Sequence, residues 1–407
     1  MNKVQKTILI TGGDGYVGTN LVNFLKKSGG YLVHPAILAS KGLDNEVILD
    51  ITDKESCEKV IAEIKPDFIV HTAGLSSLAA CEKDPGLAER INTIGTTNLA
   101  EAVSRIVPDS KFIFFSSDYV FEGDKGGYKE EDKKKPKTVY GKTKVEAENS
   151  IKTLLKNFVI LRTANIFGRG GNFFSFVEKS LQDDEKIDVF SDVYFTPTYI
   201  DYLLNSIVSL LENPFTGVIH VAGQEKISRY QFATEMAKVM GKDSNLIVGA
   251  KAPVEGLISK DSSLNTDLAA KVINGFNPSI SKAIYYHLDI LEYPYFYFAD
   301  DRGKIRGISD ESWEEINCLE SISGIVRGNH YHKFCDEGFF VVEGKIKVDF
   351  LKVEDKGQDC HFIAEKGDVF KIYPYTLHTF ETLEDSKWIN FLTKKTDQNN
   401  KDIYKLN

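Results

Sequence analysis

The chain has 407 residues, more than one hydrophobic core usually holds, so at least two domains are expected. Its formal net charge of -9 argues against nucleic acid or an anionic membrane as a partner. No apolar run approaches the roughly 18 residues that span a bilayer, and the five cysteines are scattered without a Cys-x-x-Cys pair, which is typical of a cytoplasmic protein.

A strand, a glycine-rich turn and a helix open the chain, with no apolar secretory segment before them. Thr7–Ile10 is a short apolar run of the kind buried in a parallel sheet, and Thr19–Lys27 has a helical pattern. Between them, three glycines let the backbone turn tightly and approach a pyrophosphate at the helix N-terminus. The pattern predicts a dinucleotide site whose turn contacts the cofactor through Gly12, Asp14, Gly15, Tyr16, Val17 and Gly18.

The second strand and the loop after it bear on the choice of cofactor. Tyr31–Ile37 is the predicted strand, and no acidic residue lies at its end to bind a ribose hydroxyl, whereas Ser40 and Lys41 follow soon after. We therefore expect NADPH rather than NADH. Asp50 and Ile51, which follow a further short strand, are expected at the adenine.

A third buried strand, Phe68–His71, is followed by small residues. Ala73 and Gly74 would allow a cofactor to lie across the edge of the sheet, so both are predicted to contact it. We interpret His71 as structural, because a histidine at a strand end is more often structural than catalytic.

The central strand and a later helix supply the candidate catalytic groups. After a long predicted helix, Ala88–Val107, the strand Phe112–Phe115 delivers Ser117 to the carboxyl edge of the sheet, where ligands bind in doubly wound folds. Tyr140 and Lys144 are four residues apart and share one face of a helix. We expect the Lys144 cation to lower the pKa of Tyr140 from its usual value of about 10 and so to favour a general acid. The spacing alone also fits an ordinary amphipathic helix.

Two arginines admit two interpretations each. Arg162 ends the predicted strand Phe158–Arg162, and Arg229 precedes a predicted helix, Tyr230–Met240, which Ser228 would cap. Either arginine could bind a phosphate or form a salt bridge. Helices and short strands alternate from about residue 169 to 285, which predicts a smaller lobe that holds the substrate.

These motifs together resemble those of the extended short-chain dehydrogenases/reductases, and most closely the dTDP-4-dehydrorhamnose reductase family. The resemblance covers about residues 5 to 285 and rests on Thr-Gly-x-x-Gly-x-x-Gly at 11–18, Ser116–Gly123, Tyr140–Lys144, Leu161–Thr163, Gly171–Phe173, Pro197-Thr198 and His220–Gly223. It implies that Tyr140 protonates the developing alkoxide, that Lys144 lowers the Tyr140 pKa and holds the nicotinamide ribose, and that Ser117 orients the ketone. Ser117 replaces the family's usual threonine and keeps the hydroxyl.

The fold implied by this resemblance is α/β. We expect a Rossmann-type, doubly wound parallel sheet that binds NADP over residues 1–168, and an interleaved substrate lobe over 169–290. A homodimer is also expected, with the helices at 88–107 and 140–155 as its shared bundle.

The composition changes near residues 285–298, where aromatic and β-prone residues become frequent. Short strand-like runs separated by glycine and aspartate follow, which predicts an all-β antiparallel barrel or jelly roll over 295–407. Within it, His330 and His332 are two residues apart and share a face of a strand. With Glu337 and His378 they provide three imidazoles and a carboxylate, a set suited to Zn²⁺ or another divalent transition metal. The histidine pair alone also fits two unrelated surface residues.

The spacing of these four residues, with Gly324, Gly344, Gly367 and Pro374, resembles the two motifs of the cupin superfamily. Thr376 stands where a glycine is common. The flanking segments Asp300–Gly303 and Gly328–His332 resemble the C-terminal half of the bifunctional capsular-polysaccharide reductase/epimerase family. Similar segments occur in sugar-nucleotide 3,4-ketoisomerases.

The two resemblances imply a bifunctional enzyme that acts on a nucleotide-linked 4-keto-6-deoxyhexose for surface-polysaccharide synthesis. The cupin domain would epimerise the carbon next to the ketone, and the first domain would reduce the ketone with NADPH. Two alternatives stay open. The cupin domain could be a 3,4-ketoisomerase, or the chain could be a non-catalytic NADP-binding subunit.

Overall fold

The computed structural model describes residues 5–170, 172–253, 257–300, 302–353, 359–395 and 402–406. Gly171 and Asp301, which belong to the motifs above, lie outside these ranges. Across the described ranges, every helix is too short or too polar to cross a lipid bilayer. Close contacts divide the chain into two compact units, one made of Met1–Lys179, Ile187–Ala233 and Ile247–Ile280 and the other of Ser180–Lys186, Thr234–Leu246 and Ser281–Asn407.

The first unit is built on a seven-stranded sheet in which every neighbouring pair is parallel. Its order is β3-β2-β1-β4-β5-β6-β11, so the chain reverses its direction across the sheet between β1 and β4. Ligands bind at such a switch point, at the carboxyl ends of the strands. The predicted Rossmann-type sheet is confirmed, with strands β1 Lys6–Thr11, β2 Tyr31–Ile37, β3 Val47–Ile48, β4 Phe68–His71, β5 Lys111–Ser117, β6 Phe158–Thr163 and β11 Gly217–His220.

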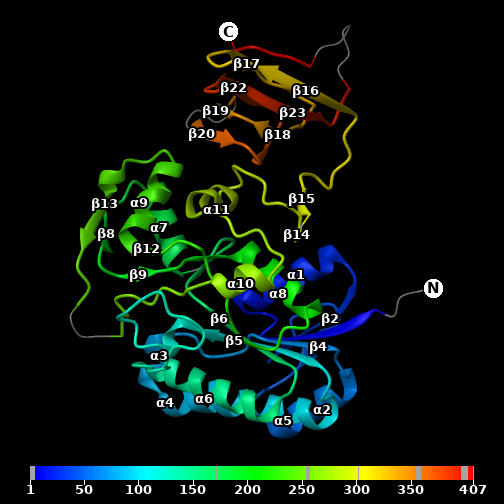
Figure 1. Cartoon of the computed structure of the whole chain (residues 1–407), viewed down its shortest axis with the longest axis vertical. Helices are drawn as coiled ribbons and strands as arrows, with labels where there is room; N and C mark the ends of the chain where they lie inside the picture. Colours follow the sequence, from blue (N-terminus) through cyan, green and yellow to red (C-terminus); the bar gives the residue numbers. More distant parts are fainter. Residues whose placement is uncertain are drawn as a thin grey trace. The chain divides into compact units, whose positions relative to one another are not determined.

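Helices cover both faces of this sheet (Figure 1). On one face, α2 (Lys54–Ile64), α5 (Thr96–Ile106) and α6 (Val139–Leu154) pack apolar side chains against the central strands, and this layer forms a continuous buried core. On the other face lie α1 (Tyr16–Ser28) and α8 (Ile200–Glu212). All seven residues of β5 are buried, because helices lie on both sides of it.

The predicted helix over residues 88–107 is divided into three segments: α4 (Pro85–Ala88), a π-helix (Glu89–Gly95) and α5. Asn92, in the π-helix, is buried, and its side chain forms hydrogen bonds with two other segments of the chain. Its Nδ2 donates to the oxygen of Leu75 at 3.0 Å and to Oγ1 of Thr143 at 3.1 Å. Single π-turns of this kind are frequent at functional sites.

The rest of the chain before residue 280 alternates short strands and helices, as expected. Three two-stranded sheets pair β7 with β10, β8 with β13 and β9 with β12. The division into units assigns the end of α7, most of α9 and the turn Ser244–Leu246 to the second unit. The elements are α3 Leu78–Lys83, β7 Ile166–Phe167, α7 Asn172–Gln182, β8 Ile187–Phe190, β9 Tyr194–Phe195, β10 Thr198–Tyr199, β12 Ile227–Ser228, α9 Arg229–Val239, β13 Ile247–Ala250 and α10 Asp267–Val272, with 3-10 turns at Asp118–Val120 and Ser244–Leu246.

The second unit is rich in strands, as predicted for an all-β domain. After α11 (Ile280–His287) and a hairpin of β14 and β15, two four-stranded antiparallel sheets follow, in the orders β16-β23-β18-β21 and β17-β22-β19-β20 (Figure 1). Their core is aromatic, with Phe339, Phe370 and Trp388 buried. The strands are β14 Phe296–Asp300, β15 Gly303–Gly307, β16 Glu315–Ser321, β17 Val326–His330, β18 Glu337–Glu343, β19 Lys345–Lys352, β20 Asp359–Glu365, β21 Val369–Ile372, β22 Thr376–Thr382 and β23 Ser386–Leu392.

Candidate functional site

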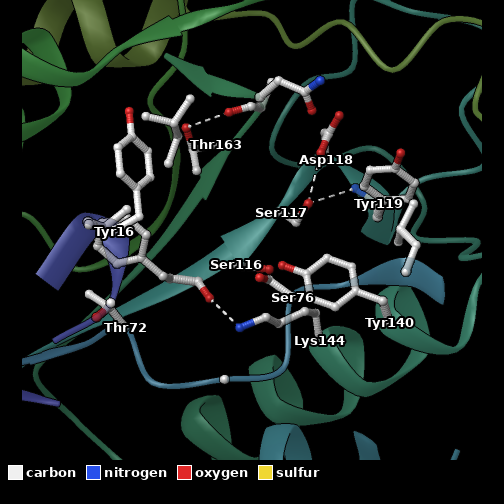
Figure 2. A pocket seen from close by; sticks show the side chains of 18 of the residues that line it. Tyr16, Thr72, Ser76, Ser116, Ser117, Asp118, Tyr119, Tyr140, Lys144 and Thr163 are labelled. Atoms are coloured by element: carbon white, nitrogen blue, oxygen red, sulfur yellow. Dashed lines mark hydrogen bonds between the residues drawn. The ribbon is translucent and has the colours of Figure 1, made fainter. Parts of the chain in front are cut away.

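A cavity of about 660 Å³ lies at the carboxyl edge of the parallel sheet (Figure 2). Residues from the glycine-rich turn, from the ends of β4, β5 and β6, and from the start of α6 line it. Seven of the predicted site residues line this cavity: Gly15, Tyr16, Val17, Gly74, Ser117, Tyr140 and Lys144. Sequence reasoning assigned no role to other lining residues, such as Ser76, Tyr119 and Thr163, although the last two lie in motifs that carry the family resemblance.

The start of α6 positions Tyr140 beside the end of β5. Thr138 caps the helix, since its side chain accepts the N–H of Gly141 at 3.0 Å. A Cβ at Gly141 would lie 2.2 Å from the backbone oxygen of Tyr119, so only glycine lets the helix approach this closely. The Tyr119 and Tyr140 rings meet edge to face at 6.1 Å. Tyr140 therefore faces the residues that follow β5.

Lys144 is buried one turn further along α6. Its Nζ donates to the backbone oxygen of Phe115 at 2.8 Å and lies 5.8 Å from the centre of the Tyr140 ring. Burial lowers the pKa of Lys144 to about 8. Lys144 is thus mostly protonated at neutral pH and provides a positive charge at the floor of the cavity.

The expectation that Tyr140 has a pKa below its usual value is wrong for this structure. Burial raises the Tyr140 pKa above its ordinary value, and the charge of Asp118 raises it further, while a hydrogen bond with Ser117 opposes both. The net shift is upward even though Nζ of Lys144 lies 5.8 Å from the centre of the Tyr140 ring. Tyr140 is therefore a neutral phenol, which is the protonation state that a proton donor requires.

Ser117 is held in place by its neighbour. Its Oγ donates to Oδ1 of Asp118 at 2.8 Å and accepts the N–H of Tyr119 at 3.3 Å (Figure 2). Asp118 is itself buried, and burial raises its pKa, although hydrogen bonds with Ser262 and Ser117 lower it. The hydroxyl predicted to orient a carbonyl is thus fixed by a buried carboxyl that sequence reasoning did not assign to it.

The glycine-rich turn has the close packing that the motif predicts. Gly12 has φ +65°, and a Cβ on it would lie 2.9 Å from Ala73. A Cβ on Gly18 would lie 2.0 Å from the oxygen of Gly12. Gly12, Gly18 and Ala73, which were predicted to contact the cofactor, form this close packing and do not line the cavity. Tyr16 links the turn to the loop after β7, because its hydroxyl donates to the oxygen of Gly168 at 2.5 Å.

Asp14 of the turn, and Asp50 and Ile51 that were expected at the adenine, have other partners in the structure. Asp14 pairs with Lys41 at 2.7 Å. Asp50 accepts hydrogen bonds from the backbone and side chain of Thr52 at 2.9 and 2.8 Å, and Ile51 is buried in the core. None of the three lines the cavity, so their contact with a cofactor stays a prediction.

Two residues whose roles were in question are structural. His71 is buried, and its ring nitrogens lie 2.6 Å from Oγ1 of Thr11 and 2.9 Å from Oγ1 of Thr96, as interpreted above. Burial lowers the His71 pKa to about 3. Arg162 forms two hydrogen bonds of 2.8 Å with the buried carboxylate of Glu148 and is itself 1% exposed, so it cannot reach a phosphate in the cavity.

Arg229, the other arginine, lines the cavity. Its guanidinium lies 5.3 Å from the centre of the Phe173 ring, and its Nε is buried without a hydrogen-bond partner among the described residues. A buried guanidinium N–H that lacks an acceptor is costly unless a ligand supplies one. The sequence had left this residue open, and the structure favours a ligand role.

The four predicted metal ligands come together in the second unit. His330, His332, Glu337 and His378 each offer one ligand atom, and these atoms lie within 4.8 Å of one another. His330 and His378 are paired across β17 and β22. Nε2 of His332 and Nε2 of His378 both lie 3.3 Å from Oε2 of Glu337.

Hydrogen bonds around this cluster fix the tautomers of His332 and His378. Nδ1 of His332 donates to the oxygen of Asp402, and Nδ1 of His378 donates to the oxygen of Thr376 at 3.1 Å. In the neutral rings the Nε2 lone pairs of His332 and His378 then face the buried Oε2 of Glu337, which has no hydrogen-bond donor in the described structure. Lone pairs gathered in this way repel unless a cation lies between them, so the residues fit a divalent metal.

Comparisons with known proteins divide the chain in the same way as its motifs. The family model of the RmlD substrate binding domain matches residues 6–288, and that of the polysaccharide biosynthesis C-terminal domain matches residues 298–404.

Among similar proteins is the spore coat polysaccharide biosynthesis protein SpsK of Bacillus subtilis. It is 32% identical over 243 residues, which are 59% of this chain and 81% of that protein. A dTDP-4-dehydrorhamnose reductase of Aggregatibacter actinomycetemcomitans is 32% identical over 234 residues, 56% of this chain and 76% of that protein. The crystal structure of dTDP-4-dehydrorhamnose reductase from Bacillus anthracis in complex with NADP has a TM-score of 0.63 and 28% identity, over 70% of this chain and 99% of that one.

Proposed function

Since the chain belongs to the RmlD substrate binding domain family, we propose that its first domain is an NADPH-dependent reductase of a nucleotide-linked 4-keto-6-deoxyhexose. The observation that carries this proposal is the convergence of Ser117, Tyr140 and Lys144 with the glycine-rich turn on one cavity. Relatives named dTDP-4-dehydrorhamnose reductase, one of them solved with NADP, support the substrate class and the cofactor.

The turn fits a dinucleotide, because Gly12 and Gly18 approach backbone so closely that a side chain would not fit and a pyrophosphate can lie against the backbone. NADPH, when bound, supplies the hydride that converts the ketone to an alkoxide. Ser117 exchanges its hydrogen bond to Asp118 for one to the ketone oxygen, and the neutral Tyr140 donates its proton to that oxygen. The Lys144 cation stabilises the phenolate that remains until solvent returns the proton.

The experiment offers several nucleotide-linked 4-keto-6-deoxyhexoses to the purified protein and follows NADPH oxidation. Wild-type protein should oxidise NADPH with at least one of them, and Tyr140→Phe should lose about 10²- to 10⁴-fold in rate, the usual contribution of a general acid, while still binding NADPH. Tight NADPH binding without turnover of any sugar would instead support the alternative of a non-catalytic NADP-binding subunit.

For the second domain we infer a cupin jelly roll, supported by its two four-stranded sheets, whose orders interleave early and late strands. We also infer that His330, His332, Glu337 and His378 hold Zn²⁺ or another divalent transition metal. A metal there would polarise a ketone or hold the mouth of the barrel in shape.

The proposed activity of this second domain is epimerisation of the carbon next to the ketone. A base removes the acidic proton, and the enolate is protonated again on its other face. If the histidines bind a metal, Tyr331 is a candidate for the base. The centre of its ring lies 6.3 Å from that of Tyr375 and 5.5 Å from that of Tyr404.

Turnover in heavy water separates this activity from its alternative. An epimerase should incorporate deuterium next to the ketone even in Tyr140→Phe, in which reduction is blocked. A product whose ketone has moved to carbon 3 would show a 3,4-ketoisomerase instead. Absence of deuterium uptake would leave the first domain as the only active one.

We also propose a homodimer and the domain bounds 1–168, 169–290 and 295–407. Light scattering of the full chain tests the dimer, and limited proteolysis tests the last boundary. A monomer, or cleavage well inside 295–407, would contradict them.

A further inference from the structure

The loop after β2 holds a carboxylate in a cradle of hydrogen-bond donors. The hydroxyl of Ser40 donates to Oε1 of Glu46, and the backbone N–H groups of Lys41 and Leu43 donate to Oε2 at 3.1 and 2.8 Å. Gly42, between them, has φ +71°. Successive N–H groups that converge in this way form an anion-binding concavity, and these hydrogen bonds hold the pKa of Glu46 below its ordinary value.

This cradle is attached to the glycine-rich turn. Nζ of Lys41 pairs with Asp14 at 2.7 Å, and the N–H of Gly13 donates to the oxygen of Ala36, near the end of β2, at 3.1 Å. A second ion pair joins the loop to α1, because Nζ of Lys26 lies 3.3 Å from a carboxylate oxygen of Asp44. The donors thus lie beside the turn and after the end of β2, which is where a dinucleotide-binding fold holds the adenosine ribose and its 2′ substituent.

The occupant of the cradle is a partly exposed side chain on a surface loop, and the residues around it from Lys41 to Asn45 are exposed. A hydroxyl, consecutive backbone N–H groups and a nearby lysine are the donors that a phosphate requires. A phosphate and the Glu46 carboxylate cannot occupy the same donors, and their negative charges repel each other.

The fold would hold the 2′-phosphate of NADPH at these donors, and we propose that Glu46 is a tethered competitor for them. NADPH binds only after Glu46 has left, so its apparent affinity is reduced by the fraction of molecules in which the cradle is filled. NADH has no 2′-phosphate and is not subject to this competition. Glu46 therefore sets the preference between the two cofactors. The inference rests on the proposed function only in that a nicotinamide dinucleotide is the cofactor.

The test is calorimetric and needs no sugar substrate. Adenosine 2′,5′-bisphosphate and adenosine 5′-monophosphate are titrated into the full-length wild-type protein, Glu46→Gln and Asp44→Asn. Asp44→Asn is the matched control, because it removes one negative charge from the same loop without touching the cradle. We expect Glu46→Gln to tighten the bisphosphate about tenfold or more, since short tethers give effective concentrations in the millimolar range. The monophosphate should bind all three proteins alike.

A second variant tests the donors themselves. Ser40→Ala in the Glu46→Gln background should weaken the bisphosphate and leave the monophosphate unchanged. Equal tightening by Glu46→Gln and Asp44→Asn would overturn the proposal in favour of a general charge effect, and so would no tightening at all. If NADPH and NADH both fail to bind the wild-type protein, the proposed reductase function fails as well. If both bind and the variants change nothing, only the cradle is wrong.

Discussion

Nζ of Lys144 donates its hydrogen bond to the backbone oxygen of Phe115 and not to Tyr140, although the two side chains lie one turn apart on α6. The lysine therefore serves as a fixed positive charge. Burial disfavours that charge and lowers the Lys144 pKa to about 8, so the proposed reduction should depend on pH.

The rate of ketone reduction should fall as the pH rises above about 8. Lys144 loses its proton in this range, and its positive charge no longer stabilises the Tyr140 phenolate. A pH profile of kcat/KM measures this, with NADPH binding followed over the same range as a control. Lys144→Met should lower the rate about a hundredfold, as loss of one charge-stabilising group does, and should remove the alkaline limb. A limb that persists in Lys144→Met would assign the titration to another group.

Arg229 should bind an anionic group of the substrate. Its Nε is buried without an acceptor in the described structure, and a phosphate oxygen of the sugar nucleotide would provide one. Hydrogen bonds to charged groups contribute about 1.5–3 kcal/mol, so Arg229→Gln should raise the substrate KM about 10- to 100-fold. The KM for NADPH should not change. Arg105→Gln, at an exposed arginine on α5, is the control, and an unaltered substrate KM in Arg229→Gln would contradict the assignment.

Arg162 should be needed for stability. It is buried in a bidentate pair with Glu148, and its removal would leave that buried carboxylate with the longer contact to Lys134, at 3.2 Å. Breaking such a pair costs about 3–5 kcal/mol, so Arg162→Ala should unfold at markedly lower denaturant concentration.

The control for this prediction is Arg105→Ala. Arg105 pairs with Glu58 on the surface, where a salt bridge contributes about 1 kcal/mol or less. Denaturation followed by circular dichroism compares the two variants. Similar midpoints would show that the buried pair is dispensable.

The sequence predicted the strands and motifs that follow from a local residue pattern. It did not predict side-chain contacts between segments that are far apart in the chain. The strands β2 and β4 have the expected bounds, and the glycine turn, Ser117 and Tyr140 meet as predicted because the carboxyl ends of parallel strands share one edge. Hydrophobic periodicity does not report which side chain accepts a given hydrogen bond. It could therefore not reveal the pair of Arg162 with Glu148 or the π-turn around Asn92, since each depends on partners from other segments of the fold.

Removal of metal should destabilise the second domain. Nε2 of His332, Nε2 of His378 and Oε2 of Glu337 are gathered with their lone pairs facing one another beside His330, an arrangement that a divalent cation relieves. Purified protein should contain about one equivalent of metal by elemental analysis, as expected for a single four-ligand site. A chelator should lower the melting temperature, and added Zn²⁺ should restore it.

The matched variants for this prediction are His378→Ala and His361→Ala. His378 is a buried member of the cluster, whereas His361 is exposed on β20 and pairs with Asp349 at 2.6 Å. His378→Ala should lose the metal and the response to the chelator, because three ligands remain where a closed site needs four. His361→Ala should keep both. Metal that is retained in His378→Ala, or a melting temperature that is indifferent to the chelator in the wild type, would contradict a metal site in this cluster.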